Sequence, residues 1–463
     1  MKRLLSLLLC AVLALFCATT AQAAGVSITL TASEYALHYA FDAGAQDPFV
    51  ILEYATPAEK GWMMLYSADG HFEGDVSIAY SGAGGKTSVA LTSARTTGSI
   101  GKASTTLPKA ADYQKPTGKS NAKVTDFVLT ETPEGFHYAF NAAGTDYMLL
   151  YWRSKEQTVT QPVYPDENGH YEGDVVSELT FARTQFTVQV KNGSGSMKKE
   201  ATVRKGYQAP EAPQRQEGRL SGVTVCIDAG HQENGRFVNE PIGPGLTGST
   251  SGKGGMAQGT KTNRRESIVC LEIGMLLRDE LLRQGANVVM TREDQMTFHT
   301  NIERCEIAEA GGAQIMLRLH CNNSSNRSKR GIQVYGPLNS DYAKAVADAD
   351  TYREMGQKLL DAMKTRVGMT LANSTGMVRL NDNYVGNNWA KMMCFLVEMG
   401  YLSNPAEEYL LVTPVYQQWL AEGMADGVYE IAVARGALLL RRRDGYDADR
   451  RHGLVYLAGT ELR

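Results

Sequence analysis

The chain has little of several features that would identify whole classes of protein. Its 47 Lys and Arg nearly balance its 50 Asp and Glu, for a net charge of −3, so it lacks the basic excess of a protein that binds nucleic acid. No apolar run reaches about 18 residues, which excludes a membrane-spanning helix. Hydrophobic residues make up 43%, an ordinary globular fraction that argues against wholesale disorder.

The first 23 residues have the pattern of a signal peptide. A basic start at residues 1–3 precedes an apolar stretch at residues 4–16, and small residues end in Ala21-Gln22-Ala23. Leu9 and Phe16 precede the two cysteines of this segment, where a lipoprotein needs a small residue, so we expect no lipid anchor. The mature protein is therefore expected to be secreted and to act outside the cell or in the cell envelope.

Removal of that segment leaves five cysteines, an odd number that excludes a complete disulfide framework. They are Cys226, Cys270, Cys305, Cys321 and Cys394. Cys226 and Cys394 lie in apolar, strand-like runs, where a thiol behaves as a small hydrophobic group. We expect reduced, buried cysteines, with a single bridge as the alternative.

Two copies of one β-domain come next. The residues at 37–42 recur at 136–141, and Gly-His-Phe-Glu-Gly-Asp-Val at 70–76 recurs at 169–175 with Tyr for Phe. Short alternating strands separated by Gly, Asp and Asn predict two antiparallel sandwiches of immunoglobulin-like type. The chain is thus expected to be multidomain, in line with roughly 150 residues per domain.

The repeats raise two questions about binding. Their equivalent histidines, His38 with His137 and His71 with His170, have no Cys or second His at metal-site spacing, so packing or turn roles are favoured over metal binding. Strand aromatics are typical of a core, and a sugar-stacking face that binds cell-wall carbohydrate is the alternative. These aromatics are Tyr39, Phe41, Tyr54, Tyr138, Phe140 and Trp152.

A Pro/Gln/Glu-rich linker separates the repeats from a segment in which strands and helices alternate. Such alternation predicts an α/β domain with a mostly parallel sheet flanked by helices. We expect its strands at 223–227, 287–292, 314–320, 331–335 and 393–398, and its helices at 266–284, 301–310, 342–365 and 414–434. The expected domain boundaries are 1–23 for the signal peptide, 24–118 and 119–208 for the repeats, 209–219 for the linker, 220–436 for the α/β domain and 437–463 for a tail of unknown role.

Candidate metal ligands lie where the strands of this sheet end. His231, His320 and Glu398 each follow or close an apolar strand, and functional groups in parallel sheets gather beyond the carboxyl ends of strands. Glu266 opens the first helix. Two His and one Glu form a common catalytic zinc set that leaves a fourth position for water. An acid at a helix N-terminus also has a purely structural explanation, so spacing alone leaves both readings open.

Five motifs in chain order then identify a family. They lie at 225–231, 289–292, 301–308, 317–322 and 395–405. In these motifs residues 220–436 resemble the zinc-dependent N-acetylmuramoyl-L-alanine amidases of the type-3 amidase family, which cleave bacterial peptidoglycan between N-acetylmuramic acid and L-alanine of the stem peptide. The resemblance implies that His231, Glu266 and His320 bind one Zn2+ and that Glu398 is the catalytic carboxylate.

Two departures from the family pattern bear on the acidic ligand. Gln232 follows His231 where the family often has glycine, and a long Gly/Ser/Thr-rich segment precedes Glu266. Glu240 is therefore the alternative ligand. Asp228 and Asn322 are candidates to orient the ligands, and Cys321 is expected to pack.

The predicted chemistry is amide hydrolysis by zinc-activated water, with Glu398 moving the proton. Two alternatives are a zinc exopeptidase or other amidohydrolase on a related fold, and a non-catalytic protein that binds the cell wall.

Overall fold

The structure is a computed structural model of the chain. It describes residues 19–21, 26–33, 36–57, 60–78, 84–109, 123–132, 135–143, 148–153, 158–163, 165–176, 187–192, 195–200, 210–232, 238–250, 255–262, 264–367 and 377–436. The tail at 437–463 lies outside these ranges, as does most of the expected signal peptide. Among the helices of the described residues, none is long and apolar enough to cross a membrane.

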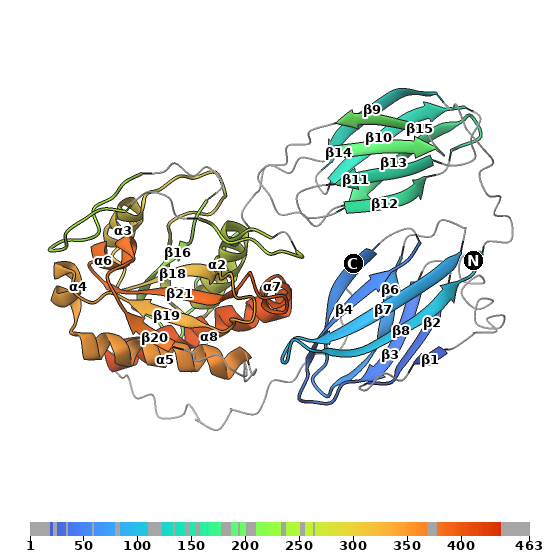
Figure 1. Ribbon diagram of the computed structural model, residues 1–463. Coiled ribbons are helices and arrows are strands. Elements are labelled where there is room, and N and C mark those ends of the chain that lie inside the picture. Colours follow the sequence, from blue (N-terminus) through green and yellow to red (C-terminus); the bar gives the residue numbers. More distant parts are fainter. Residues whose placement is uncertain are drawn as a thin grey trace.

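Each N-terminal repeat folds into two antiparallel sheets, and seven strands have the same order in both copies (Figure 1). In the first copy an eighth strand, Thr19–Ala21, pairs with residues 28–30 and comes from the expected signal peptide. The first has sheets β1-β2-β3-β6 and β5-β4-β7-β8, and the second has β13-β10-β9 and β12-β11-β14-β15. The strands of the first are β1 (Thr19–Ala21), β2 (Ile28–Ala32), β3 (Ala36–Asp42), β4 (Phe49–Ala55), β5 (Lys60–Tyr66), β6 (His71–Ser77), β7 (Gly85–Ser93) and β8 (Ser99–Leu107). Those of the second are β9 (Val124–Thr132), β10 (Gly135–Ala142), β11 (Met148–Arg153), β12 (Thr158–Val163), β13 (His170–Val176), β14 (Thr187–Asn192) and β15 (Gly195–Glu200).

The strand aromatics of the repeats form cores between these sheets. In the first repeat, Tyr39 and Phe41 pack with residues of both sheets. In the second, Phe140 is fully buried and stacks on Tyr171, with ring centroids 4.6 Å apart. Trp152 belongs to the same core. The prediction of core residues is confirmed for five of the six aromatics, and Tyr54 is partly buried against the core of the first repeat.

The repeat histidines lie on exposed strand faces, beside carboxylates. Strand pairing places His38 and His71 on either side of Glu73, with each Nε2 3.6 Å from a different Glu73 oxygen. The Nδ1 atoms contact Asp75 and Asp42, at 3.1 and 2.7 Å. Polar cross-strand contacts of this kind stabilise an antiparallel sheet. These side chains therefore make cross-strand contacts, and the backbone N–H of His71 also closes the preceding turn by donating to Asp69 at 3.1 Å.

The C-terminal domain contains one six-stranded sheet, in the order β17-β16-β18-β21-β19-β20. Its strand pairs are parallel except β19 with β21, so the predicted mostly parallel sheet is confirmed. The strands are β16 (Thr224–Ala229), β17 (Asn287–Met290), β18 (Ile315–Asn322), β19 (Gln333–Gly336), β20 (Met377–Leu380) and β21 (Met393–Tyr401).

Helices cover both faces of the sheet. On one face Ile227, Leu317 and Phe395 share a core with three helices, which are α2 (Glu266–Arg283), α5 (Ala349–Val367) and α8 (Pro414–Ala434). On the other face Cys226 and Cys394 pack with Cys305 of α3 (Asn301–Ala310). All five cysteines of the C-terminal domain are buried and unbridged, as predicted.

The helix expected at 342–365 is two helices, α4 (Asp341–Val346) and α5. Ala347 is extended, with φ −166° and ψ 163°. The Asp348 carboxylate then accepts a hydrogen bond of 2.8 Å from the Thr351 backbone N–H, the interaction of a helix N-cap. Three short elements were also missed: β20, α6 (Val385–Trp389) and α7 (Glu407–Leu411).

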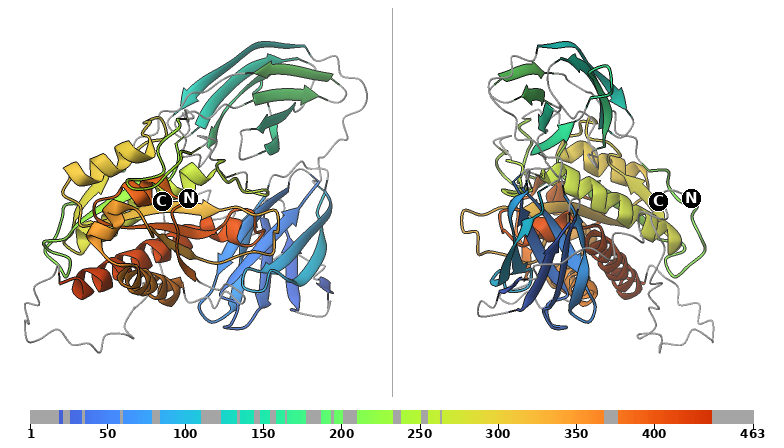
Figure 2. Two further views of the ribbon diagram at one scale, coloured as in Figure 1. Left: turned by 60° about the vertical axis from the view of Figure 1, so that its left-hand side comes forward. Right: turned by 90° about the vertical axis from the view of Figure 1, so that its right-hand side faces the viewer.

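The first sandwich is docked on the C-terminal domain (Figures 1 and 2). Phe49 from β4 contacts Tyr416 and Trp419 of α8, with ring centroids 6.0 and 5.3 Å apart. The Tyr409 hydroxyl donates a hydrogen bond of 3.2 Å to Glu53. Phe49 is 1% exposed and belongs to the core of the C-terminal domain. The first sandwich therefore packs against the C-terminal domain through a shared hydrophobic core.

Arg330 links the two domains by hydrogen bonds. Its guanidinium donates to the backbone carbonyl of Ala94, at 2.9 Å, and to that of Arg95. We expect Arg330→Ala to weaken docking by about 1–3 kcal/mol, since the buried carbonyls lose charged donors. Limited proteolysis should then cleave between the domains faster than in the exposed neighbour variant Lys329→Ala. Equal cleavage rates would contradict a docking role for Arg330.

Candidate metal centre

His231 lies in a loop that follows β16 directly. Its backbone has φ +58°, a left-handed conformation that is uncommon for a residue other than glycine. The preceding Gly230 donates its backbone N–H to the Leu319 carbonyl, at 2.9 Å. A Cβ at Gly230 would lie 2.6 Å from the His320 ring, so glycine is needed there. The loop thereby brings the two histidines together, with ring centroids 4.9 Å apart.

Glu266 lies between the two imidazoles. Its Oε2 is 3.1 Å from His231 Nε2 and its Oε1 is 2.9 Å from His320 Nδ1. The three residues offer ligand atoms that all lie within 4.8 Å of one another. Burial acts to raise the pKa of Glu266, but hydrogen bonds from the histidines outweigh it and hold the pKa below its ordinary value. Burial lowers the pKa of His320, which favours the neutral imidazole that a metal requires.

Glu398 lies beside this group on the neighbouring strand. It is the register partner of His320 in the β18–β21 pair. Burial, followed by the charge of Glu266, raises the pKa of Glu398 to about 8. Its Oε2 and His320 Nε2 are buried atoms without a hydrogen-bond partner. Because buried polar atoms are nearly always paired, these two atoms mark a place where a polar ligand fits.

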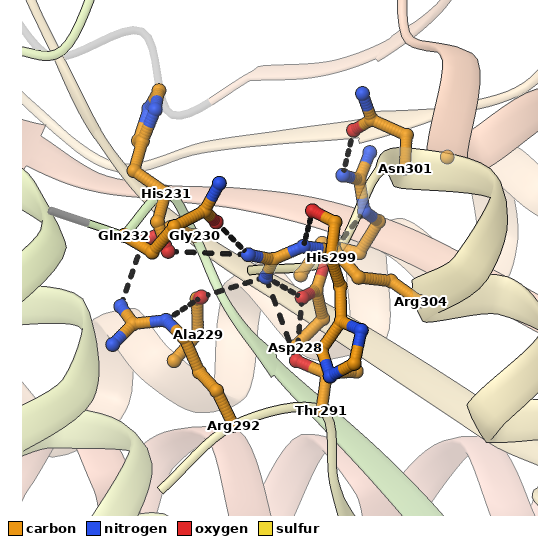
Figure 3. A network of polar contacts seen from close by, with 12 residues as sticks. Asp228, Ala229, Gly230, His231, Gln232, Thr291, Arg292, His299, Asn301 and Arg304 are labelled. Carbon is orange, nitrogen blue, oxygen red and sulfur yellow. Dashed lines mark hydrogen bonds and ion pairs between the residues drawn. The ribbon is translucent and has the colours of Figure 1, made fainter. Parts of the chain in front are cut away.

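A buried charge network lies beneath the His231 loop (Figure 3). The Asp228 carboxylate accepts hydrogen bonds from Thr291 at 2.8 Å, from Arg318 at 2.9 Å and from Arg304. Burial opposes ionisation of Asp228, but the charges of Arg304 and Arg318 hold its pKa well below the usual range. Asp228 contacts arginines rather than a ligand imidazole, so its predicted orienting role is at most indirect.

The arginines of this network hold the backbone of the loop. Arg304 donates to the carbonyl of His231 at 3.2 Å, and Arg292 donates to that of Gly230 at 2.8 Å. Arg292 also donates to the Ser267 carbonyl, at 2.6 Å. It thus ties the His231 loop to the N-terminus of α2, where Glu266 lies. These arginines were not predicted from the sequence, although an arginine inside an apolar strand, as at Arg318, is a signal of a buried ion pair.

Three other residues that the sequence placed near the site do not lie among the possible metal ligands. Glu240 accepts hydrogen bonds from the backbone N–H groups of Asn301 and Ile302, at 3.2 and 2.8 Å, so it caps α3 and is not in the group that could hold a metal. The Asn322 side chain donates to Gln333, at 3.1 Å. Cys321 is buried, as predicted, and its backbone N–H donates to Glu266 at 3.0 Å.

Comparison with known proteins shows what this domain is similar to. Residues 225–430 match the family model described as N-acetylmuramoyl-L-alanine amidase. The germination-specific N-acetylmuramoyl-L-alanine amidase of Bacillus subtilis (strain 168) is 26% identical over 231 residues, which cover 47% of this chain and 83% of that protein. The probable cell wall amidase LytH of Staphylococcus aureus is 26% identical over 218 residues, which cover 46% of this chain and 60% of that protein.

An uncharacterised Bacillus subtilis (strain 168) protein, YqiI, is 27% identical over 209 residues, covering 45% of this chain and 84% of that protein. Among solved structures, the N-acetylmuramoyl-L-alanine amidase from Clostridium difficile 630 is 24% identical with a TM-score of 0.37, covering 46% of this chain and 98% of that one.

Proposed function

We infer that the chain is a peptidoglycan amidase that uses zinc, since its residues 225–430 match the family model described as N-acetylmuramoyl-L-alanine amidase. The bond hydrolysed is the amide between N-acetylmuramic acid and L-alanine of the stem peptide. The observation that carries the zinc assignment is the group of His231, Glu266 and His320, whose ligand atoms lie within 4.8 Å of one another. Glu398 is assigned as the catalytic carboxylate.

The donor set suits zinc. Two imidazoles and one carboxylate are a common set of protein ligands in catalytic zinc sites. The partnerless His320 Nε2 and Glu398 Oε2 point to the same conclusion, because a metal and its substrate would give these atoms partners. When bound there, zinc would polarise the scissile carbonyl and make water a stronger nucleophile at neutral pH.

The protein supplies the proton transfers. Glu398 takes a proton from the attacking water and gives it to the departing L-alanine nitrogen. Without metal, burial and the Glu266 charge raise the pKa of Glu398 to about 8, and a bound zinc would lower it toward the neutral range in which a group can both accept and donate a proton. Arg304 holds the backbone of His231, and Arg292 holds Gly230 and Ser267, the residues next to His231 and Glu266. No serine or cysteine nucleophile is required.

The reaction is tested on the products of purified sacculi. Mass spectrometry should find stem peptides with a free L-alanine amine and glycan strands that keep an intact lactyl group. Free amino acids would instead indicate the exopeptidase alternative, and intact sacculi would indicate a protein that only binds the wall.

The ligand assignment predicts loss of metal. In His231→Ala and His320→Ala, zinc affinity should fall by more than the roughly 10–100-fold that loss of an outer hydrogen-bond partner costs. Zinc content after dialysis against a chelator measures this directly. His299→Ala is the control, since this histidine is outside the metal group and should keep one zinc. A fully metallated His320→Ala protein would contradict the assignment.

The proposal also covers the N-terminal segment and the two repeats. We propose that residues 1–23 direct export, that the protein is secreted and acts in the cell envelope, and that the domains follow the expected boundaries. The two repeats are proposed to be immunoglobulin-like. Support comes from their seven shared strands, which pair as three plus four in both copies. We also propose that the repeats bind wall carbohydrate, through residues other than the buried strand aromatics.

A further inference from the structure

A row of polar side chains continues from Glu398 across the sheet. Gln333 of β19 is the register partner of Glu398, and two residues along, Tyr335 is the partner of Arg379 in β20. Because successive side chains alternate between the faces of a sheet, these residues share the face of Glu398. We call Asn322, Gln333, Tyr335, Arg379 and the adjacent Tyr384 the polar strip.

Contacts within the polar strip hold its members in place. The Tyr335 hydroxyl donates to Gln333 Oε1 at 2.6 Å, and Asn322 Nδ2 donates to the same oxygen at 3.1 Å. The rings of Tyr335 and Tyr384 lie with centroids 5.1 Å apart. Tyr384 immediately precedes α6, so the strip is bounded on one side by that helix.

The strip is open to solvent at the end away from Glu398. Arg379 is exposed, whereas Tyr384, Gln333 and Asn322 are half-buried. Charges of opposite sign flank Tyr335: burial and then the Glu398 charge raise its pKa, and the Arg379 charge acts in the opposite direction. The strip therefore runs from the catalytic carboxylate to an exposed guanidinium.

We propose that Arg379, with Tyr335 and Tyr384, forms a subsite for a carboxylate of the stem peptide on the residue that follows L-alanine. This inference rests on the proposed function. Arg379 is two strands across and two residues along from Glu398, a Cα separation of roughly 12 Å for ordinary sheet spacing. An extended peptide advances about 3.3–3.6 Å per residue, so the second stem residue comes within reach of the long arginine side chain.

The positive charge of Arg379 indicates which part of the substrate would bind at the polar strip. The N-acetylmuramic acid lactyl group is already in amide linkage and offers no anion, whereas the stem peptide carries carboxylates. A guanidinium recognises a carboxylate by paired, charge-assisted hydrogen bonds. The glycan is accordingly placed on the other side of the metal centre.

The test uses two muramoyl dipeptides that differ in one group. One carries a free carboxylate on its second residue, and the other carries the neutral amide there. The wild-type enzyme should have a kcat/KM about tenfold higher for the acid. In Arg379→Gln this ratio should fall to about one, mainly through KM for the acid, and Arg379→Glu should favour the amide. Arg379→Lys should restore part of the preference.

Arg353→Gln, an exposed arginine of α5, is the matched control and should keep the wild-type ratio. Equal kcat/KM for the two dipeptides in the wild-type enzyme would overturn the subsite, as would an unchanged ratio in Arg379→Gln. If the wild-type enzyme cleaves sacculi at the proposed bond but shows no preference, only the subsite is wrong. If it cleaves neither sacculi nor dipeptides, the proposed function fails and the subsite with it.

Discussion

Glu398→Gln is expected to lower the rate of cell-wall hydrolysis by about 10²–10⁴-fold, the usual contribution of a general acid and base. Glutamine keeps the size of the side chain but cannot move a proton at Oε2. Zinc content should be unchanged, because the proposed ligands are His231, Glu266 and His320. The measurement is the release of peptide from purified walls, with zinc determined on the same sample.

Glu430→Gln, an exposed acid of α8, is the matched control and should have wild-type activity. Full activity of Glu398→Gln would show that another group moves the proton. Loss of zinc in the same variant would instead reassign Glu398 as a ligand.

Asp228→Asn is expected to destabilise the C-terminal domain by about 3–5 kcal/mol, because it leaves buried guanidinium groups without their counter-charge. Asp228 is 0% exposed, and its partners Arg304 and Arg318 are 4% and 3% exposed. The described helices lie between residues 266 and 434. Chemical unfolding followed by the helical circular dichroism signal therefore reports on this domain.

The difference in the free energy of unfolding between wild type and Asp228→Asn should depend on pH with a definite sign. The pKa of Asp228 is depressed in the folded protein, so its contribution is present above the unfolded pKa of about 3.9 and is lost as the pH falls further. The free energy of unfolding should differ most between wild type and Asp228→Asn near pH 7, and this stability gap should shrink below about pH 4. Asp350→Asn, at a carboxylate 94% exposed, should show no gap. A gap that is constant with pH would mean that the Asp228 charge does not stabilise the domain.

Local sequence patterns were sufficient to predict the larger helices and strands of the C-terminal domain. The helices at α2, α3 and α8 begin where the sequence places them, because long runs of periodic apolar residues leave little choice of structure. The elements that were missed, β20, α6 and α7, have four or five residues each. Segments this short carry too few residues for a period to be recognised.

The candidate site was predictable for a related reason. His320 and Glu398 are on strands whose apolar runs are plain in the sequence, and parallel strands bring their carboxyl ends to one edge. Glu266 and Glu240 were less easily separated, because both lie in or beside a Gly-rich segment without periodicity. The structure separates them: Glu266 contacts both histidines, and Glu240 caps α3.

The sequence by itself determined that two β-repeats precede an α/β domain whose ordered motifs resemble those of N-acetylmuramoyl-L-alanine amidases, because composition, periodicity and ordered motifs are local properties. Only the tertiary structure decided what lies around them. The arginines beneath His231, the docking of the first sandwich through Phe49 and the polar strip from Glu398 to Arg379 each join residues far apart in the chain. The reason is physical: a buried charge or an aromatic contact depends on which surfaces meet, and spacing along one strand or helix does not contain that information.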